Sequence, residues 1–188
     1  MRNFILAAAA VFSGMFTANA QDVQGVEKSM FNIQAGATGV WVSHEGRLGN
    51  EFALRTEIGI DLWTFTSSND NDYNYMLPSI TLEPRWYYNI EKRAEKGKYT
   101  ANNSANFLTV SVEYLSGGLG IGKDNGLDLP EILTVIPKWG IRRAISKSNF
   151  NYELGAGLGY QAYIANNDDM KSDSDVGFDL HVRFGYTF

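Results

Sequence analysis

Histidine and paired carboxylates are the side chains in this chain that could carry acid–base or nucleophilic chemistry. The 188 residues include 2 histidines and no cysteine, so thiolate metal sites, cysteine nucleophiles and disulfides are excluded. His181 lies in the middle of a strand-like segment among charged residues, where a hydrogen-bonded structural histidine is expected. His44 falls in a predicted turn, and the sequence singles out no serine partner for either histidine. We therefore expect no catalytic residue and no enzyme activity.

An acid pair could in principle form among three carboxylates, namely Glu57, Asp61 and Glu83. Arg55 and Arg85 each lie two residues from one of them. Salt bridges to these arginines account for the carboxylates without any catalytic role.

The glycine-rich segment 118–123, GLGIGK, resembles a phosphate-binding loop only in its glycines. It lacks the spacing of a Walker motif, and no helix is predicted after it. We expect an ordinary loop here, and no cofactor.

Two acidic segments could attract a divalent cation. Alternating oxygen ligands suit Ca²⁺ or Mg²⁺, which would also bridge such loops to anionic lipopolysaccharide. However, the spacing of an EF-hand is absent, so a solvated loop is expected and no metal site is assigned. The residues concerned are Asp70 and Asp72 in the first segment, and Asp168, Asp169, Asp173 and Asp175 in the second.

The elements that carry these residues are predicted to be strands. Seven segments alternate apolar and polar residues with a period of two. Each is longer than the ~5–6 residues usual in a soluble sheet and reaches the ~9–11 residues of a tilted membrane strand. A periplasmic β-sandwich is the alternative that these lengths disfavour. The segments are residues 31–42, 52–65, 75–90, 106–116, 132–145, 150–164 and 176–188.

The last segment has the clearest pattern. Residues 176–188 alternate large apolar side chains with Gly, Asp, His, Arg and Thr, and end on Phe188. A strand that is apolar on one face and charged on the other, at the end of an exported chain, indicates the closing strand of an outer-membrane barrel.

Export is predicted from residues 1–20, which have the features of a cleaved signal peptide. Arg2 gives a positive start, residues 4–16 are mostly apolar, and Ala18-Asn19-Ala20 forms a cleavage site before Gln21. No run of ~18 apolar residues follows, so no membrane-spanning helix is expected. The predicted mature protein is a single barrel domain, residues 21–188, in the cell outer membrane.

The composition is compatible with such a barrel. Hydrophobic residues make up 44% of the chain and the mean hydropathy is −0.23, because lipid-facing and interior residues average out along each strand. The 19 Gly, 10 Tyr and 11 Phe against 4 Pro favour strands and aromatic girdles. Loss of Arg2 with the signal peptide lowers the formal net charge from −5 to −6, which disfavours nucleic acid as a partner.

The charges in the middle of the predicted strands share the face opposite the apolar residues. In a barrel the apolar face contacts lipid, where a misplaced Arg or Lys costs ~2–4 kcal/mol at the midplane, and the polar face lines the interior. The predicted interior charges are Arg55, Glu57, Asp61, Glu83, Arg85, Glu113, Lys138, Arg142, Glu153, Asp179, His181 and Arg183.

These interior charges nearly cancel, with six acidic residues against five basic ones and His181. A barrel of about eight strands has an interior just wide enough for side chains. Because an isolated buried ion is prohibitively costly, the charges are predicted to pair with one another and to leave no open pore.

The orientation follows if Phe188 lies at the periplasmic end. Residues 43–51, 91–105 and 146–149 are then periplasmic, and residues 66–74, 117–131 and 165–175 are extracellular. Seven strands would leave the N-terminus outside, whereas bacterial single-chain barrels have an even number. We predict an all-β, closed antiparallel up-and-down transmembrane barrel of about eight strands, the eighth coming from residues 22–30 or from a break within one of the seven segments. The predicted periplasmic aromatic girdle is Trp86, Tyr88, Trp139, Tyr186 and Phe188.

Four stretches resemble an uncharacterised family of small outer-membrane β-barrel proteins from Gram-negative bacteria. They are KSMFNIQ (28–34), LRTEIG (54–59), LEPRWYYN (82–89) and WGIRR (139–143), and the similarity extends over essentially the whole mature chain. The resemblance implies a small barrel in the outer membrane and brings no assigned activity or catalytic residue. It also implies that the barrel-insertion machinery recognises the C-terminal strand through Phe188.

Two classes of function remain open at this point. The first is a monomeric structural or surface-interaction protein of the cell envelope, with outer-membrane lipid and lipopolysaccharide as its surroundings. The second is a lipid-active or hydrophobic-ligand-binding barrel. Its ligand groove would be lined near the outer rim by Trp63, Phe65, Tyr73, Tyr75, Tyr160 and Tyr163.

Overall fold

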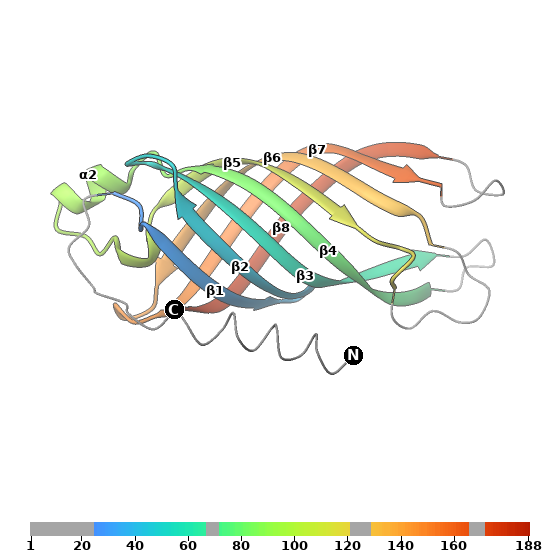
Figure 1. Ribbon diagram of the computed structural model, residues 1–188, viewed down its shortest axis with the longest axis horizontal. Coiled ribbons are helices and arrows are strands. Elements are labelled where there is room, and N and C mark those ends of the chain that lie inside the picture. Colours follow the sequence, from blue (N-terminus) through green and yellow to red (C-terminus); the bar gives the residue numbers. More distant parts are fainter. Residues whose placement is uncertain (1–24, 67–71, 121–128, 166–171) are drawn as a thin grey trace, which may run out of the picture.

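The chain forms a closed, all-β barrel of eight antiparallel strands in sequence order (Figure 1). The computed structural model describes residues 25–66, 72–120, 129–165 and 172–188. The prediction of a closed antiparallel barrel of about eight strands is therefore confirmed. The predicted signal peptide and Gln21 lie outside the described residues. The strands are β1 (Ser29–Gly36), β2 (Gly39–Arg47), β3 (Phe52–Thr66), β4 (Asp72–Trp86), β5 (Asn106–Leu115), β6 (Glu131–Ala144), β7 (Phe150–Ile164) and β8 (Asp173–Thr187).

The eighth strand comes from a break that the sequence pattern concealed. Residues 31–42, predicted as one strand, form the β1–β2 hairpin, in which Gly36 pairs with Gly39. Residues 22–30 supply only the first two residues of β1. The turn residues Ala37 and Thr38 are small and weakly polar, so they do not interrupt the alternation visibly. The phase nevertheless shifts across the turn, because Ile33 and Val40, an odd and an even position, both point outward.

The predicted strand 75–90 is also corrected at its end. β4 finishes at Trp86, and Ile90 is the buried first residue of α2 (Ile90–Glu95) rather than a lipid-facing residue. A turn closes here because the Ile90 N–H donates to the Tyr87 carbonyl at 3.0 Å. A short 3₁₀ helix, η1 (Ala101–Asn103), follows before β5. We call this end of the barrel, which also carries the C-terminus, the α2 end, and the opposite end, where β3, β5 and β7 finish, the loop end (Figure 1).

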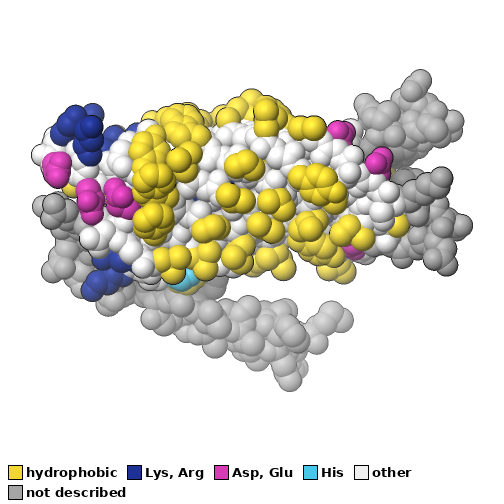
Figure 2. Space-filling model, turned by 90° about the horizontal axis from the view of Figure 1, so that it is seen from above, with side chains coloured by type: hydrophobic (Ala, Val, Ile, Leu, Met, Phe, Trp, Pro, Cys, Tyr) yellow, Lys and Arg dark blue, Asp and Glu magenta, His cyan; other side chains and the backbone are white. Residues whose placement is uncertain are grey.

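The outer wall of the barrel is apolar between its two ends. Large side chains such as Ile58, Leu82 and Val112 point outward and are exposed. Figure 2 shows hydrophobic side chains spread over the wall, with the visible Lys, Arg, Asp and Glu gathered at the ends. Within the described parts of the chain, no helix has the length and apolar character needed to cross a membrane.

The interior consists of three layers. An apolar cluster closes the α2 end, and a second apolar cluster lies toward the loop end, with buried charged side chains between them. The first cluster is Val26, Ala53, Tyr87, Ile90, Ala105 and Phe107. The second is Tyr75, Leu77, Leu115, Leu129 and Ile132, with Trp63 and Tyr163 packed against it.

Candidate functional site

The charged layer is the site that the sequence singled out. Strands β3 to β8 project every predicted interior residue to the inside, because side chains alternate strictly between the two faces of a strand. Glu113 and Asp179 are half-buried, and the others are buried. The neighbouring glycines leave room for these long side chains: a Cβ at Gly155, for example, would lie 2.3 Å from the His181 ring.

Glu153 on β7 is the centre of the network. Its Oε1 accepts hydrogen bonds from Arg55 at 2.9 Å and from Arg85 at 2.8 Å, and its Oε2 accepts a second bond from Arg85 at 3.0 Å. Arg142 lies 3.8 Å from Oε2. One fully buried carboxylate thus neutralises guanidinium groups from β3, β4 and β6, which ties together strands that are not neighbours.

Further ion pairs extend from this centre toward β8. Glu57 is shared by Arg55 and by Arg183, whose Nη1 lies 2.8 Å away. Glu83 is likewise shared, by Arg85 at 2.5 Å and by Lys138 at 2.7 Å. Each carboxylate therefore serves two cations, which is the arrangement that makes burial of many charges tolerable.

The last branch of the network contains the lumen histidine. Lys138 lies 3.3 Å from Asp179, and Asp179 lies 2.6 Å from His181 Nδ1. His181 Nε2 is 3.7 Å from Glu153, so the branch returns to the centre. His181 is thus held within the ion-pair network, with no serine among its described partners.

Two predicted members have no basic partner. In the described part of the chain, no Lys, Arg or His nitrogen lies within 4.0 Å of Asp61 or Glu113. Asp61 accepts hydrogen bonds from the Trp41 indole at 3.1 and 3.2 Å and from Ser79. Glu113 accepts one long bond from Thr81, at 3.5 Å. The prediction that all interior charges pair with one another is therefore wrong for these two carboxylates.

Glu45 is an interior residue that the sequence analysis missed. It lies on β2, 3.5 Å from Arg142 and 3.9 Å from Arg85, and it also accepts a hydrogen bond from Asn103 of η1. It was assigned to a turn over residues 43–51, whereas β2 continues to Arg47. The alternation of Trp41, Ser43 and Glu45 on one face was the signal that could have revealed it.

Aromatic packing closes the network at the α2 end. The Arg85 guanidinium lies 4.1 Å from the centre of the Phe107 ring, and the Tyr87 and Phe107 rings are 5.6 Å apart. Gly140 on β6 makes room for Phe107, because a Cβ there would lie 2.2 Å from the ring. Burial raises the pKa of the Tyr87 phenol, which lies just beyond β4, so the hydroxyl stays neutral against this apolar cluster.

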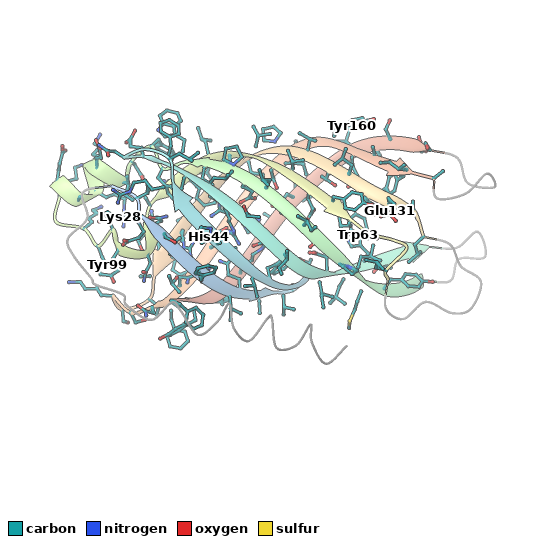
Figure 3. The ribbon with its side chains drawn as sticks, in the orientation of Figure 1. Lys28, His44, Trp63, Tyr99, Glu131 and Tyr160 are labelled. Atoms are coloured by element: carbon teal, nitrogen blue, oxygen red, sulfur yellow. The ribbon has the colours of Figure 1, made fainter. Side chains whose placement is uncertain are left out.

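His44 lies in β2 and not in a turn as predicted. It is half-buried on the outer side of the strand, where its Nε2 is 2.9 Å from the Ser29 hydroxyl and its ring is 4.7 Å from that of Phe31 (Figure 3). No carboxylate among the described residues contacts His44. The Ser29–His44 pair consequently lacks the carboxylate that orients the histidine base and stabilises its charged form in hydrolases.

The aromatic residues predicted as a girdle gather in two groups at the α2 end. Trp139 donates a hydrogen bond to the Tyr88 hydroxyl at 2.9 Å, and the Tyr88 ring is 6.0 Å from that of Trp86. Tyr186 and Phe188 form the second group, with their rings 5.0 Å apart. Both groups combine apolar ring faces with a polar edge, as side chains do at a membrane interface.

The aromatic groove suggested near the outer rim is not formed as expected. Tyr75 is buried in the inner apolar cluster, whereas Tyr160 points away from the barrel and is exposed. Figure 3 shows both Tyr160 and Trp63 toward the loop end, with Tyr160 on the outer wall. The side chains of Phe65 and Tyr73 are not described.

The acidic and glycine-rich segments are only partly described. Asp173 and Asp175, at the start of β8, are exposed, and each accepts a hydrogen bond from the backbone N–H of the following residue. Gly118 donates to Glu131 at 3.3 Å. In the described ranges no three His, Cys, Asp or Glu side chains are grouped as metal ligands would be. Asp70, Asp168, Asp169 and residues 121–123 lie outside the described residues, and the Asp72 side chain is not described.

Comparison with known proteins gives no relative. No protein family matches this chain, and neither a curated protein nor a solved structure is significantly similar to it.

Proposed function

We propose that the chain is a small outer-membrane β-barrel protein with a structural or surface-interaction role in the cell envelope. The observation that carries the proposal is the inverted distribution of polarity. Buried charges such as Arg85, Arg142 and Glu153 fill the inside of a closed barrel, while Ile58, Leu180 and Phe184 are exposed on its outside. A soluble barrel would have to hydrate this apolar wall, whereas in a bilayer the wall contacts lipid.

The same layers support a role without solute transport. Ion pairs around Glu153 occupy the middle of the barrel, and the cluster around Phe107 closes the α2 end. A barrel of eight strands has little interior volume beyond its own side chains. We infer that the protein anchors its loops at the cell surface and stabilises the envelope, rather than conducting ions or solutes.

The orientation is part of the proposal. The aromatic groups at the α2 end, the C-terminal Phe188 and the short connections between β2 and β3 and between β6 and β7 support a periplasmic α2 end. Asp173 and Asp175, at the loop end, then face the outside. Recognition of the last strand, through Phe188, by the barrel-insertion machinery is part of the same proposal.

Cell fractionation tests the location directly. The full-length protein, expressed in a Gram-negative host, is expected in the outer-membrane fraction, and mass spectrometry is expected to find Gln21 as its first residue. Recovery in the soluble periplasmic fraction would contradict the proposed location.

The interfacial depth of the aromatic groups is a second expected result. In bilayers with brominated acyl chains, Trp86 and Trp139 are expected to be quenched most by bromines near the headgroups. The quenching of each tryptophan is obtained as the difference between the wild type and the variant that lacks it, Trp86→Phe or Trp139→Phe. Maximal quenching by bromines at the bilayer centre would show that the proposed register in the membrane is wrong.

A further inference from the structure

The β1–β2 hairpin is too short to complete the barrel wall. Pairing of β1 with β8 stops at Gly36 and Arg183, and pairing of β2 with β3 stops at Gly39 and Asp61. Toward the loop end, β8 continues over residues 173–182 and β3 over residues 62–66. Among the described residues, the Leu62 N–H still donates to the Thr38 carbonyl of the hairpin turn at 2.7 Å, and no strand pairs with the rest of these extensions on that side. We call this interruption of the wall the lateral gap.

The lateral gap opens onto the apolar part of the wall. The outward side chains of β8 beside it are Val176, Phe178 and Leu180, which are 71%, 64% and 68% exposed. Backbone N–H and C=O groups at the depth of hydrocarbon must be hydrogen-bonded, since open sheet edges facing lipid are not tolerated there. The Ser174 and Val176 N–H groups are satisfied by Asp173 and Asp175. The rest of the β8 edge, nearer the hairpin, requires an occupant that brings polar groups into an apolar surrounding.

The interior side of the lateral gap holds two carboxylates that lack an ion-pair partner, although Arg183 lies at the same level. Asp61, which pairs with Gly39 at the tip of the hairpin, and Glu113 are the two interior carboxylates without a basic partner in the described chain. The Trp41 ring, whose indole N–H donates to Asp61, lies 3.7 Å from the Arg183 guanidinium. These carboxylates favour an occupant with a cationic group, because a charge-assisted hydrogen bond is about twice as strong as a neutral one.

A second polar group on this side also lacks a partner. The Thr134 hydroxyl is buried and makes no hydrogen bond within the described structure. Its side chain lies beside Gly177, on the part of β8 that borders the lateral gap. The interior beside this part of β8 therefore contains a buried hydroxyl that is still available as a donor or acceptor.

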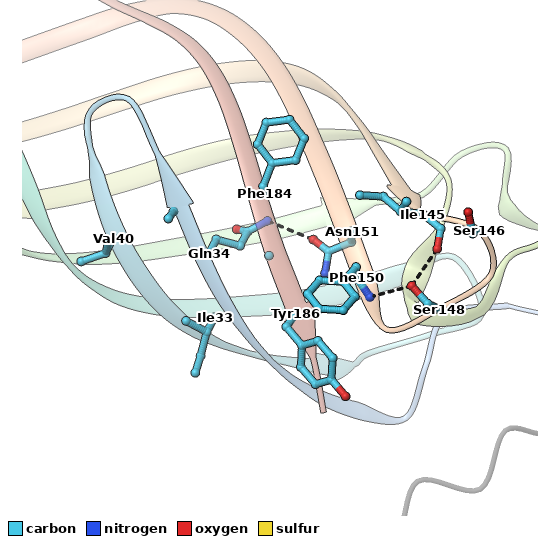
Figure 4. A pocket seen from close by; sticks show the side chains of 12 residues that line it. Ile33, Gln34, Val40, Ile145, Ser146, Ser148, Phe150, Asn151, Phe184 and Tyr186 are labelled. Atoms are coloured by element: carbon cyan, nitrogen blue, oxygen red, sulfur yellow. Dashed lines mark hydrogen bonds between the residues drawn. The ribbon is translucent and has the colours of Figure 1, made fainter.

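Outside the barrel, an apolar groove of about 520 Å³ runs along β1 and β8 from the hairpin tip to the β6–β7 turn, where Ile145, Ser146 and Ser148 line it (Figure 4). Ile33, Phe184 and Tyr186 form its sides, and Ala35 and Val40 line it next to the turn. The groove thus begins where the lateral gap ends. A single molecule could therefore place its apolar chain in the groove and its polar head in the lateral gap.

We propose that the lateral gap is a port that binds one amine-headed phospholipid of the phosphatidylethanolamine class. Its ammonium group faces Asp61 and Glu113, its phosphate and ester groups meet the free backbone edge of β8, and one acyl chain lies along Ala35 and Val40. The port rests on the proposed membrane location and adds a specific lipid to the structural role.

Photo-crosslinking tests the port in reconstituted bilayers. A benzophenone amino acid is placed at Leu180, beside the lateral gap, or at Val110, an exposed control position on β5. In bilayers of phosphatidylethanolamine, the crosslinking yield at Leu180 is expected to exceed that at Val110 by about tenfold, the factor that one charge-assisted hydrogen bond supplies. In phosphatidylglycerol, which has no amine, the two yields are expected to be equal.

The carboxylates supply the matched variants. Asp61→Asn together with Glu113→Gln is expected to bring the yield at Leu180 down to that at Val110, and Glu113→Gln alone is expected to lower it if the double variant does not fold. Equal crosslinking yields at both positions in phosphatidylethanolamine would overturn the port. A fall of the Leu180 yield to the Val110 yield when lipopolysaccharide displaces this lipid would overturn it as well. Absence of crosslinking at both positions would contradict the membrane location and, with it, the port.

Discussion

Replacing Arg85 with alanine is expected to lower the free energy of unfolding by ~3–5 kcal/mol. Arg85 is 2% exposed and contributes hydrogen bonds to both Glu83 and Glu153, so its loss leaves buried carboxylates with too few donors. The loss of its contact with the Phe107 ring adds to this cost. Urea titration in detergent micelles, followed by tryptophan fluorescence, measures the change.

Arg143→Ala is the matched control for Arg85→Ala. Arg143 is a half-buried arginine at the rim that hydrogen-bonds to Asn106 and to the Arg142 carbonyl, outside the ion-pair network. Its removal is expected to cost about 1 kcal/mol or less. If the two variants lost equal stability, the interior network would not be a main source of stability.

Gly140→Val is expected to destabilise the barrel by ~1–3 kcal/mol through overpacking. The added Cβ would lie 2.2 to 2.7 Å from atoms of the Phe107 ring, and this ring is enclosed by Tyr87 and Arg85. Combining the change with Phe107→Leu should recover part of the loss, because the smaller side chain vacates the ring volume. The same urea titration gives both values, and additive losses in the double variant would contradict the steric account.

Much of the fold could be predicted because the alternation of a barrel strand is constrained on both faces. Charges at Arg55, Glu83 and Glu153 define the interior face, and the apolar residues between them define the other face. The β1–β2 turn could not be located in the same way. A tight turn of small residues keeps the alternation almost intact, and only a change of phase between Ile33 and Val40 reveals it.

The partners within the interior depend on geometry that the sequence does not contain. Glu153 meets Arg55 and Arg85 across the barrel, over sequence separations of 98 and 68 residues, so strand tilt and stagger decide the contact. Glu45 was missed because the end of β2 was misplaced. Asp61 and Glu113 were expected to pair but lie where Trp41, Ser79 and Thr81 are the available donors.

The lateral gap illustrates a further limit of pattern reading. Strand lengths in β8 and β3 could be estimated from their alternation, but the level at which the hairpin stops depends on the register of β1 against β8. Register is set by pairing across the sheet and not by one segment alone.

Conductance across planar bilayers tests the central claim most directly, namely that ion pairs and apolar clusters close the interior of a membrane-spanning barrel. Purified full-length protein, refolded and inserted, is expected to give no stable ion-conducting steps, while a porin inserted under the same conditions gives its usual steps. A reproducible conductance of defined size from this protein would contradict the closed interior and would identify a channel instead.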